Sequence, residues 1–257
     1  MAADYGNLLD FTGKVIFVSG ASRGIGEAVA RAFAANGGEV VVSSRDAEAC
    51  EKVAAAIRAN GGKAHAKACH AGRMDDIEAA FAWIDDTFGR IDVLVNCGGT
   101  NPYYGPIGET PETAYDKTFD VNLKGPFYLS SAAVSRMKTA KSGAIVNVAS
   151  INGLTPGHLQ GVYSMTKAAM INMTKAFARE YGPDGIRVNA ICPGLVETRM
   201  TQVFTENEAA LREYTAQFPL RRAGQPADMV GGVLYLASDA AAYTTGTTLV
   251  MDGGHTA

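Results

Sequence analysis

The segment Val15-Ile-Phe-Val-Ser-Gly20-Ala-Ser-Arg-Gly24-Ile-Gly26 joins an apolar strand to the helix that follows it. Its three glycines stand in a turn where the backbone must bend sharply or approach a ligand closely. The first turn of the helix offers unpaired amide groups, which bind phosphates well. The spacing differs from the general dinucleotide fingerprint Gly-x-Gly-x-x-Gly. An ordinary glycine turn is the alternative, but a position directly after the first strand favours a nucleotide site.

Short apolar runs alternate with longer stretches of helical periodicity along the rest of the chain. This order predicts an α/β fold of the Rossmann type, a doubly wound parallel sheet of about seven strands with helices on both faces. The predicted strands are 14–19, 39–44, 64–68, 91–96, 144–149, 187–191 and 247–251. The predicted helices are 24–36, 46–59, 73–88, 112–139, 162–181 and 226–237. No linker interrupts the pattern, so residues 1–257 are expected to form one domain.

Composition and charge argue against several classes of protein. The chain has 257 residues, is 47% hydrophobic and carries a net charge of −3, so it offers no basic surface for nucleic acid or membranes. It has no apolar run long enough to cross a bilayer, and its first residues lack the features of a signal peptide. We therefore expect a cytoplasmic protein. The four cysteines are widely spaced and the histidines scattered, which predicts neither disulfides nor a metal site.

A second pattern lies in Tyr163-Ser-Met-Thr-Lys167, thirteen residues after Ser150. Residues four apart share one face of a helix, so a phenol and an ammonium can meet at one point. A nearby cation is expected to lower the pKa of the Tyr163 phenol from its usual value of about 10. A Ser150 hydroxyl in reach would hold a carbonyl or alcohol oxygen while the tyrosine transfers a proton. Tyr-x-x-x-Lys alone also occurs by chance on amphipathic helices.

Together these motifs resemble those of the short-chain dehydrogenase/reductase family, over nearly the whole chain. The family's glycine motif matches Gly20 to Gly26, and its catalytic residues match Asn122, Ser150, Tyr163 and Lys167. Further matches are Asn96-Cys-Gly-Gly99 after the fourth predicted strand, and Pro193-Gly194 with Thr198 after the sixth. The resemblance implies an enzyme that passes hydride between a nicotinamide cofactor and a substrate carbon.

The resemblance also implies a role for each matched residue. Lys167 would bind the nicotinamide ribose, and Tyr163 would be the general acid in reduction and the general base in oxidation. Ser150 would orient the substrate oxygen, and Asn122 would hold a water that links Lys167 to solvent. The alternatives are a helix kink for Asn122 and a local backbone bond for Ser150. The implied cofactor contacts are Gly20, Ser22, Arg23, Gly24, Ile25, Gly26, Ser44, Arg45, Asn96, Gly98, Tyr163, Lys167, Pro193, Gly194, Val196 and Thr198.

The end of the second predicted strand bears on the choice of cofactor. An acidic residue there would bind the adenosine ribose, whereas an arginine would meet a 2′-phosphate. The strand ends in Ser44-Arg45, and Arg23 in the glycine turn adds a second cation. NADP(H) is therefore the expected cofactor, with NAD(H) as the alternative. The alternative is that Arg23 is a solvated loop residue and that Arg45 only covers the start of the next helix. In that case neither arginine would favour NADP(H). His70 stands where the family commonly has an adenine-contacting aspartate, which leaves that contact open.

Residues 195–222 are predicted to form a helical lid over the substrate. Apolar residues recur along this segment at Met200, Val203, Phe204, Leu211, Tyr214 and Phe218. With Tyr104, Leu154 and Leu159, among others, they would form an apolar pocket for a ketone or secondary alcohol with a largely hydrocarbon body. The alternative is that this apolar stripe simply packs on the core.

Four further interpretations concern function and partners. The segments Val41 to Arg45, Cys69-His70 and Asn101 to Gly105 resemble those of NADP-linked carbonyl reductases. Similarity to 3-oxoacyl-carrier-protein reductases is the alternative, with a basic surface at Arg136, Lys138, Lys141 and Arg179 for the carrier. A nucleotide-sensing regulator on the same fold is the non-enzymatic alternative. Family resemblance also implies a homotetramer packed through helices 112–139 and 162–181 and the last strand.

Overall fold

The computed structural model describes residues 8–202 and 207–257, so Val203 and Phe204 of the predicted lid lie outside the described residues. Its centre is a seven-stranded parallel sheet in the order β3-β2-β1-β4-β5-β6-β7. The strands are β1 (Val15–Ser19), β2 (Glu39–Ser44), β3 (Lys63–Ala68), β4 (Val93–Asn96), β5 (Gly143–Val148), β6 (Ile186–Pro193) and β7 (Thr248–Met251). The winding direction reverses between β1 and β4, and such a reversal opens a crevice at the carboxyl ends of the strands. The predicted doubly wound parallel fold is confirmed.

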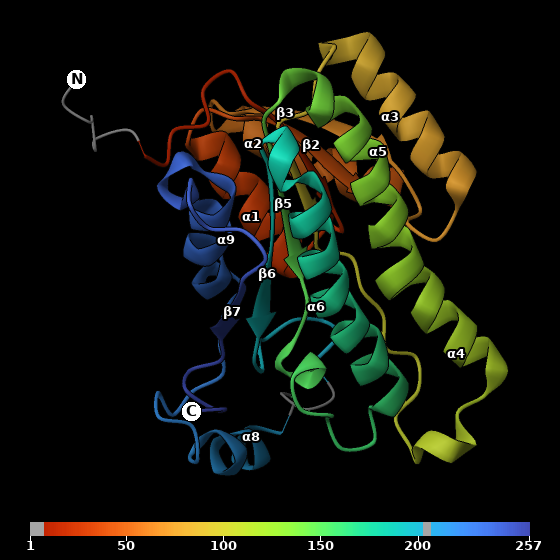
Figure 1. Ribbon diagram of the computed structural model, residues 1–257. Helices are drawn as coiled ribbons and strands as arrows, with labels where there is room; N and C mark the ends of the chain where they lie inside the picture. The colour runs from red at the N-terminus through yellow and green to blue at the C-terminus, as the bar shows by residue number, and fades with distance from the viewer. Residues whose placement is uncertain (1–7, 203–206) are drawn as a thin grey trace.

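Helices cover both faces of this sheet (Figure 1). One face carries α1 (Gly24–Ala35), α2 (Ala47–Ala59) and α9 (Val230–Ala237), and the other carries α3 (Met74–Phe88), α5 (Gly125–Ala140) and α6 (Gly161–Tyr181). The helix α4 (Glu112–Phe119) precedes α5, and α8 (Glu208–Thr215) lies beyond the carboxyl ends of β6 and β7, close to the C-terminus. Short 3₁₀ turns are η1 (Ile107–Glu109), η3 (Ile151–Gly153), η4 (Gly182–Asp184), η5 (Pro226–Met229) and η6 (Asp239–Ala241). No helix of the described residues is long and apolar enough to cross a membrane.

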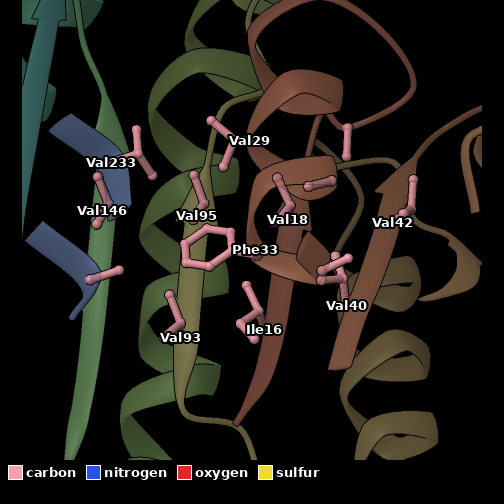
Figure 2. Packing of buried hydrophobic residues seen from close by; sticks show 14 of the residues in the cluster. Ile16, Val18, Val29, Phe33, Val40, Val42, Val93, Val95, Val146 and Val233 are labelled. Atoms are coloured by element: carbon pink, nitrogen blue, oxygen red, sulfur yellow. The ribbon is translucent and has the colours of Figure 1, made fainter. Parts of the chain in front are cut away.

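Strand β1 contributes to two cores because successive side chains point to opposite faces. Ile16 and Val18 of β1 pack with Phe33 of α1 in one core, as Figure 2 shows. Phe17, between them in sequence, packs with Phe81 of α3 in the other. All five side chains are buried. Burial on both faces explains why the central strands β1 and β4 are continuous apolar runs, whereas β3 (Lys63–Ala68), at the edge of the sheet, alternates polar and small apolar residues.

The prediction of one continuous helix over 112–139 was wrong. A π-helical turn, η2 (Asp120–Lys124), separates α4 from α5. Pro126 has no amide hydrogen, so the carbonyl of residue 122 loses its helical partner and the turn widens there. Asn122 sits in this turn with its side chain fully buried. The interruption thus turns the Asn122 amide toward groups outside its own helix.

Candidate active site

The carboxyl ends of the strands open into a cleft of about 730 Å³. It is lined by every residue that the sequence resemblance assigned to the cofactor except Asn96. These are Gly20, Ser22, Arg23, Gly24, Ile25, Gly26, Ser44, Arg45, Gly98, Tyr163, Lys167, Pro193, Gly194, Val196 and Thr198. Ser150 lies in the same lining. Residues from five different strand ends are therefore gathered at one place, as parallel topology requires.

The glycine turn forms one wall of the cleft through close backbone packing. Gly20 has a φ of +78°, and a Cβ there would lie 2.5 Å from the amide nitrogen of Gly98. A Cβ on Gly26 would lie 2.3 Å from the carbonyl oxygen of Gly20. The residue before α1, Arg23, makes no side-chain cap, so the first amides of the helix keep their hydrogens for an anion. The residues present fit the pyrophosphate of a dinucleotide.

Two cations lie at the end of β2 and in the glycine turn. Arg23 and Arg45 are exposed, line the cleft, and form no ion pair within residues 8–202 and 207–257. Asp46 is engaged otherwise, because its carboxylate caps α2 by accepting the amide of Ala49 at 3.0 Å. The cleft wall at this point is therefore basic, and the carboxylate of the neighbouring Asp46 is used to cap α2. This geometry suits a phosphate next to the adenosine ribose.

His70 also lines the cleft, and its bonds hold it in a local turn. Its Nδ1 accepts the amide of Gly72 at 3.1 Å, and its own amide donates to the Asp76 carboxylate at 2.8 Å. Asp76 therefore acts on the His70 backbone from the first turn of α3. The cleft is lined here by the segment Cys69–Ala71, with His70 at the position where the family commonly has an aspartate.

The predicted catalytic group lies on the opposite wall, where η3 and α6 meet. Ser150 Oγ accepts the amide of Asn152 at 3.1 Å and is hydrogen-bonded to the Tyr163 hydroxyl. Lys167 Nζ donates to the carbonyl oxygen of Val148 at 2.8 Å and lies 5.7 Å from the centre of the Tyr163 ring. The structure thus brings Ser150, Tyr163 and Lys167 together, as the sequence spacing predicted.

The pKa of the tyrosine moves the other way from the prediction. Burial raises the pKa of Tyr163 to about 12, and the bond from Ser150 lowers it only in part. Burial also lowers the pKa of Lys167 to about 8. Desolvation disfavours a phenolate and an ammonium alike, and the ammonium stands over the ring rather than at the hydroxyl. The lowering of the Tyr163 pKa that was expected from Lys167 is not found, and the loss of solvent around the phenol raises that pKa.

Asn122 lies behind the cleft and not in its lining. Its Oδ1 accepts the amide of Thr100 at 2.8 Å, and its Nδ2 donates to the Thr100 carbonyl at 2.9 Å and to Thr166 Oγ1 at 3.2 Å. Both ends of the side chain are thus used to tie the segment after β4 to α6. A water held for Lys167 remains a prediction, whereas the alternative of a helix irregularity at Asn122 agrees with the π-turn.

Asn96 is likewise a buried connector. Its Nδ2 donates to Asn147 Oδ1 at 2.8 Å and to Ser130 Oγ at 3.1 Å, and the residue is 1% exposed. Within the described part of the chain its Oδ1 has no hydrogen-bond partner. Its side chain joins β4 to β5 and α5 beneath the cleft, and the segment that follows it, Cys97–Thr100, reaches the lining.

Sequence reasoning missed several residues at the mouth of the cleft. Lys117 of α4 and Arg199 line it, and the hydroxyl of Thr201 accepts the amide of Thr198 at 3.0 Å. The same hydroxyl donates to the Val196 carbonyl at 2.5 Å, which fixes the loop after β6. The serine/threonine spacing of this loop was the available signal, since such hydroxyls often bond nearby backbone. Nothing in the sequence places Lys117 at the cleft.

A parallel α/β fold with a glycine-lined dinucleotide cleft and a Ser-Tyr-Lys cluster defines a nicotinamide-linked oxidoreductase. Comparison with known proteins agrees. A family model described as "Enoyl-(Acyl carrier protein) reductase" matches residues 20–256. The chain belongs to the short-chain dehydrogenase/reductase family and is an NAD(P)-dependent oxidoreductase acting on CH-OH groups.

Three relatives illustrate the range of similarity. Human "Dehydrogenase/reductase SDR family member 4" is 36% identical over 244 residues, which cover 94% of this chain and 87% of that protein. The L-rhamnose 1-dehydrogenase (NAD(P)(+)) of Azotobacter vinelandii is 38% identical over 246 residues, 94% of this chain and 96% of that protein. The crystal structure of a gluconate 5-dehydrogenase from Burkholderia cenocepacia in complex with NADP and tartrate has a TM-score of 0.93 at 27% identity. That comparison covers 97% of this chain and 98% of the other.

Proposed function

We propose that the protein transfers a hydride between NADP(H) and a ketone or secondary alcohol, with Tyr163 as the general acid or base. The observation that carries this proposal is the hydrogen bond between Ser150 and Tyr163 on the wall of the dinucleotide cleft, with Lys167 beside the tyrosine ring. A sensing regulator would need the cleft but not this proton-transfer group, so the cluster favours the enzyme.

The residues divide the chemistry between them. The nicotinamide cofactor, held by the glycine turn and the loop after β6, would supply or accept the hydride. Ser150 Oγ is fixed by the Asn152 amide, so its own hydrogen is free to point to Tyr163 or to a substrate oxygen. Tyr163 would then donate its hydroxyl proton to the carbonyl oxygen as that oxygen gains charge. A phenol whose pKa is about 12 is protonated at neutral pH, which suits it to act as the acid in reduction.

Preference for NADP(H) rests on the two cleft arginines. Arg23 and Arg45 have no carboxylate partner among the residues described, and a guanidinium pairs well with a phosphate. The capping role of Asp46 supports the same choice, because a carboxylate bound to α2 competes less for a ribose hydroxyl. The gluconate 5-dehydrogenase neighbour is described in complex with NADP.

An apolar substrate body is supported by side chains around the catalytic group. Leu154 and Leu159 in the segment between Ser150 and Tyr163 are 46% and 43% exposed, and Met200 of the cleft lining is 39% exposed. Exposed apolar residues beside a polar reaction centre are typical of small-ligand sites. A ketone or secondary alcohol with a hydrocarbon portion would cover them.

The carrier-protein alternative has less support. Arg136 forms two bonds with the Asp85 carboxylate, at 2.8 and 2.6 Å, and Lys138 lies 3.5 Å from the Asp184 carboxylate. Two of the four predicted carrier-binding cations are thus already paired with acids of this chain. None of the four lines the cleft.

We also propose that the protein is a homotetramer of one-domain subunits. Phe127 and Tyr128 of α5 and Met165 of α6 are between 38% and 44% exposed, and so is Val250 on the outermost strand β7. Large apolar side chains gathered on two helices and a sheet edge mark association surfaces. Light scattering on the purified protein would test the subunit number, and a monomer would contradict it.

The function itself is tested by following NADPH absorbance with a panel of ketones and alcohols. We expect turnover of at least one ketone with an apolar body, NADPH preferred over NADH, and loss of turnover in Tyr163→Phe by about a hundredfold or more. NADPH binding should be unchanged in that variant. Turnover that survives in Tyr163→Phe would overturn the mechanism, and tight NADPH binding without any turnover would favour the regulator.

A further inference from the structure

The turn that follows β3 fixes the imidazole ring of His70. Its Nδ1 accepts the amide of Gly72 at 3.1 Å, so this nitrogen carries a lone pair and the hydrogen of the neutral ring stands on Nε2. Gly72 also leaves room for the ring, since a Cβ there would lie 3.1 Å from His70 Cε1 and 3.3 Å from Nδ1. The ring therefore lies against the Gly72 backbone, with an N–H group at Nε2.

The other hydrogen-bonding groups of His70 are all engaged. Its backbone amide donates to the Asp76 carboxylate at 2.8 Å, and its carbonyl accepts the amide of Arg73 at 2.9 Å. Asp76 stands in the first turn of α3, so the segment is held at the start of that helix. Within residues 8–202 and 207–257 the Nε2 atom has no hydrogen-bond partner, and it is open to solvent. Because His70 lines the cleft, an N–H donor on a firmly held residue is available there.

The order of the strands indicates which part of a dinucleotide this donor meets. From the catalytic group beyond β5, the cleft passes the ends of β4, β1, β2 and β3. The glycine turn after β1 fits the pyrophosphate, and the end of β2 meets the adenosine ribose. The amide of Cys69 donates to the Ser44 carbonyl at 2.9 Å, which joins the residue before His70 to the residue before Arg45. The unit beyond the ribose is the base, and it falls at the end of β3.

We propose that His70 is a specificity-determining residue for the cofactor, whose Nε2–H donates a hydrogen bond to an acceptor atom on the edge of the purine base. This inference rests on the proposed NADP(H)-dependent function and concerns the base alone. The 6-amino group of adenine is itself a donor, so it is not the group that His70 binds. The protein should therefore accept a purine that carries an oxygen in place of this amino group.

The polarity of the side chain decides which bases fit. Adenine offers the acceptors N1 and N7 beside its 6-amino group, and hypoxanthine offers O6 and N7. An N–H donor pairs with either base, whereas a carboxylate at the same position pairs with the amino group and is repelled by O6. The acidic residues of the described cleft lining are Asp46 and Glu197. Asp46 caps α2 and Glu197 follows β6, so neither stands at the end of β3 to bind the amino group.

The test compares the dissociation constants of NADPH and of its 6-deamino analogue, in which hypoxanthine replaces adenine, by calorimetry. Wild-type protein should bind the two within about threefold of each other. His70→Asp can still accept the Gly72 amide, as in an Asx turn, so the turn is kept. This variant should bind NADPH about tenfold more tightly than the analogue. A tenfold preference for NADPH in wild type, or equal affinities in His70→Asp, overturns the proposal.

Two further variants separate the donor from the ring that carries it. His70→Phe keeps a ring but has no donor, and both cofactors should bind about fivefold more weakly. His70→Gln carries an amide N–H close to the position of Nε2 and should restore most of that affinity. Unchanged affinity in His70→Phe would contradict the hydrogen bond, and a failure of His70→Gln to restore binding would assign the loss to the turn.

His65→Phe is the matched control for His70→Phe. His65 lies on β3, bonds the Glu39 carboxylate at 2.6 Å and does not line the cleft. Its replacement should leave the affinities for both cofactors as they are in wild type. An equal loss of affinity in the two phenylalanine variants would mean that the effect comes from β3 as a whole, which contradicts a contact made by His70.

These binding measurements need no turnover, so they keep the two proposals separate. Equal binding of both cofactors by a protein that reduces no ketone would contradict the oxidoreductase function but not the His70 contact. Turnover with NADPH, together with a tenfold preference for adenine over hypoxanthine, would contradict the His70 contact but not the function. Binding of neither cofactor would contradict both.

Discussion

The cofactor half and the substrate half of the site are built in different ways. The cofactor half comprises the turn from β1 to α1, the end of β2 and residues 193–198, and its shape is set by backbone packed against backbone. The proposed substrate half comprises loops 100–106 and 150–160 together with α8, and within these segments side-chain bonds and ring contacts set the shape. The shape of the cofactor half cannot change unless the backbone of the sheet moves. The shape of the substrate half can change when a single side chain is replaced, which suits a fold that is used with many substrates.

The largest effect should come from the cofactor half. In Gly26→Ala the new methyl would lie 2.3 Å from the Gly20 carbonyl oxygen, a backbone atom that cannot turn aside. We expect a loss of about 3 kcal/mol in NADPH binding, about a hundredfold, from displacement of the turn. Calorimetry or NADPH fluorescence measures it. Gly26 does not have a positive φ, so the change isolates the steric contact.

Gly61→Ala is the matched control for that variant. Gly61 has a φ of +81°, and nothing lies within 4 Å of the new methyl, so only backbone strain is added. This should cost about 1–2 kcal/mol of unfolding free energy and leave NADPH affinity unchanged. If Gly26→Ala bound NADPH as wild type does, the glycine turn would be able to change its backbone conformation, and the contrast between the two halves would be wrong.

Lys167 stands where the two halves meet, and its burial predicts a pH-dependent effect on stability. Its pKa is lowered from an ordinary 10.5 to about 8, so between these values the unfolded chain binds more protons than the folded one. The lysine's contribution to stability therefore falls as pH drops from about 10.5 to about 8. The free energy of unfolding of Lys167→Met minus that of wild type should therefore be about 2–3 kcal/mol higher at pH 7 than at pH 10.

Urea unfolding at the two pH values measures this difference. Lys175→Met, at an exposed position on the same helix, is the matched control for the loss of a lysine side chain from α6. If the difference in unfolding free energy between Lys167→Met and wild type were constant from pH 7 to pH 10, the Lys167 ammonium would have to be hydrated in the folded protein. Turnover should be lost in Lys167→Met at either pH.

The contrast between the halves also explains how much the sequence could predict. The strands, the glycine turn and the shared face of Tyr163 and Lys167 depend on local spacing, and each was predicted correctly. The bond from Asn101 to Gln160 joins residues 59 positions apart, and no local pattern indicates such a pairing. The raised pKa of Tyr163 depends on burial, which tertiary packing sets. The π-turn at Asn122 has a local cause in Pro126, but its purpose shows only in the bond to Thr166, 44 residues away.

A smaller effect is expected from the charged rim of the cofactor half. Arg45→Ala removes a guanidinium that the proposal places on the 2′-phosphate, a charge-assisted contact. NADPH affinity should fall about tenfold while NADH affinity stays nearly constant, and the loss should shrink at high salt. Arg58→Ala on α2 serves as control, because that guanidinium pairs with Glu51 away from the cleft. Equal losses for NADPH and NADH would assign Arg45 a role in folding rather than in selectivity.

The smallest effect is expected in the substrate half, at the contact between α8 and the C-terminus. The His255 ring packs edge-on against Phe218 at 4.4 Å and lies 5.9 Å from Tyr214 of α8, while the Gly253 carbonyl accepts the amide of Leu220. His255→Ala removes two ring contacts worth about 0.5–1.5 kcal/mol each. Hydrogen exchange in Glu208–Thr215 should rise and kcat/KM should fall a few-fold, with NADPH affinity unchanged. Tyr243→Ala, at a side chain that contacts solvent only, should alter neither. If His255→Ala weakened NADPH binding as much as substrate turnover, α8 would belong to both halves, and the substrate half could not vary independently of the cofactor site.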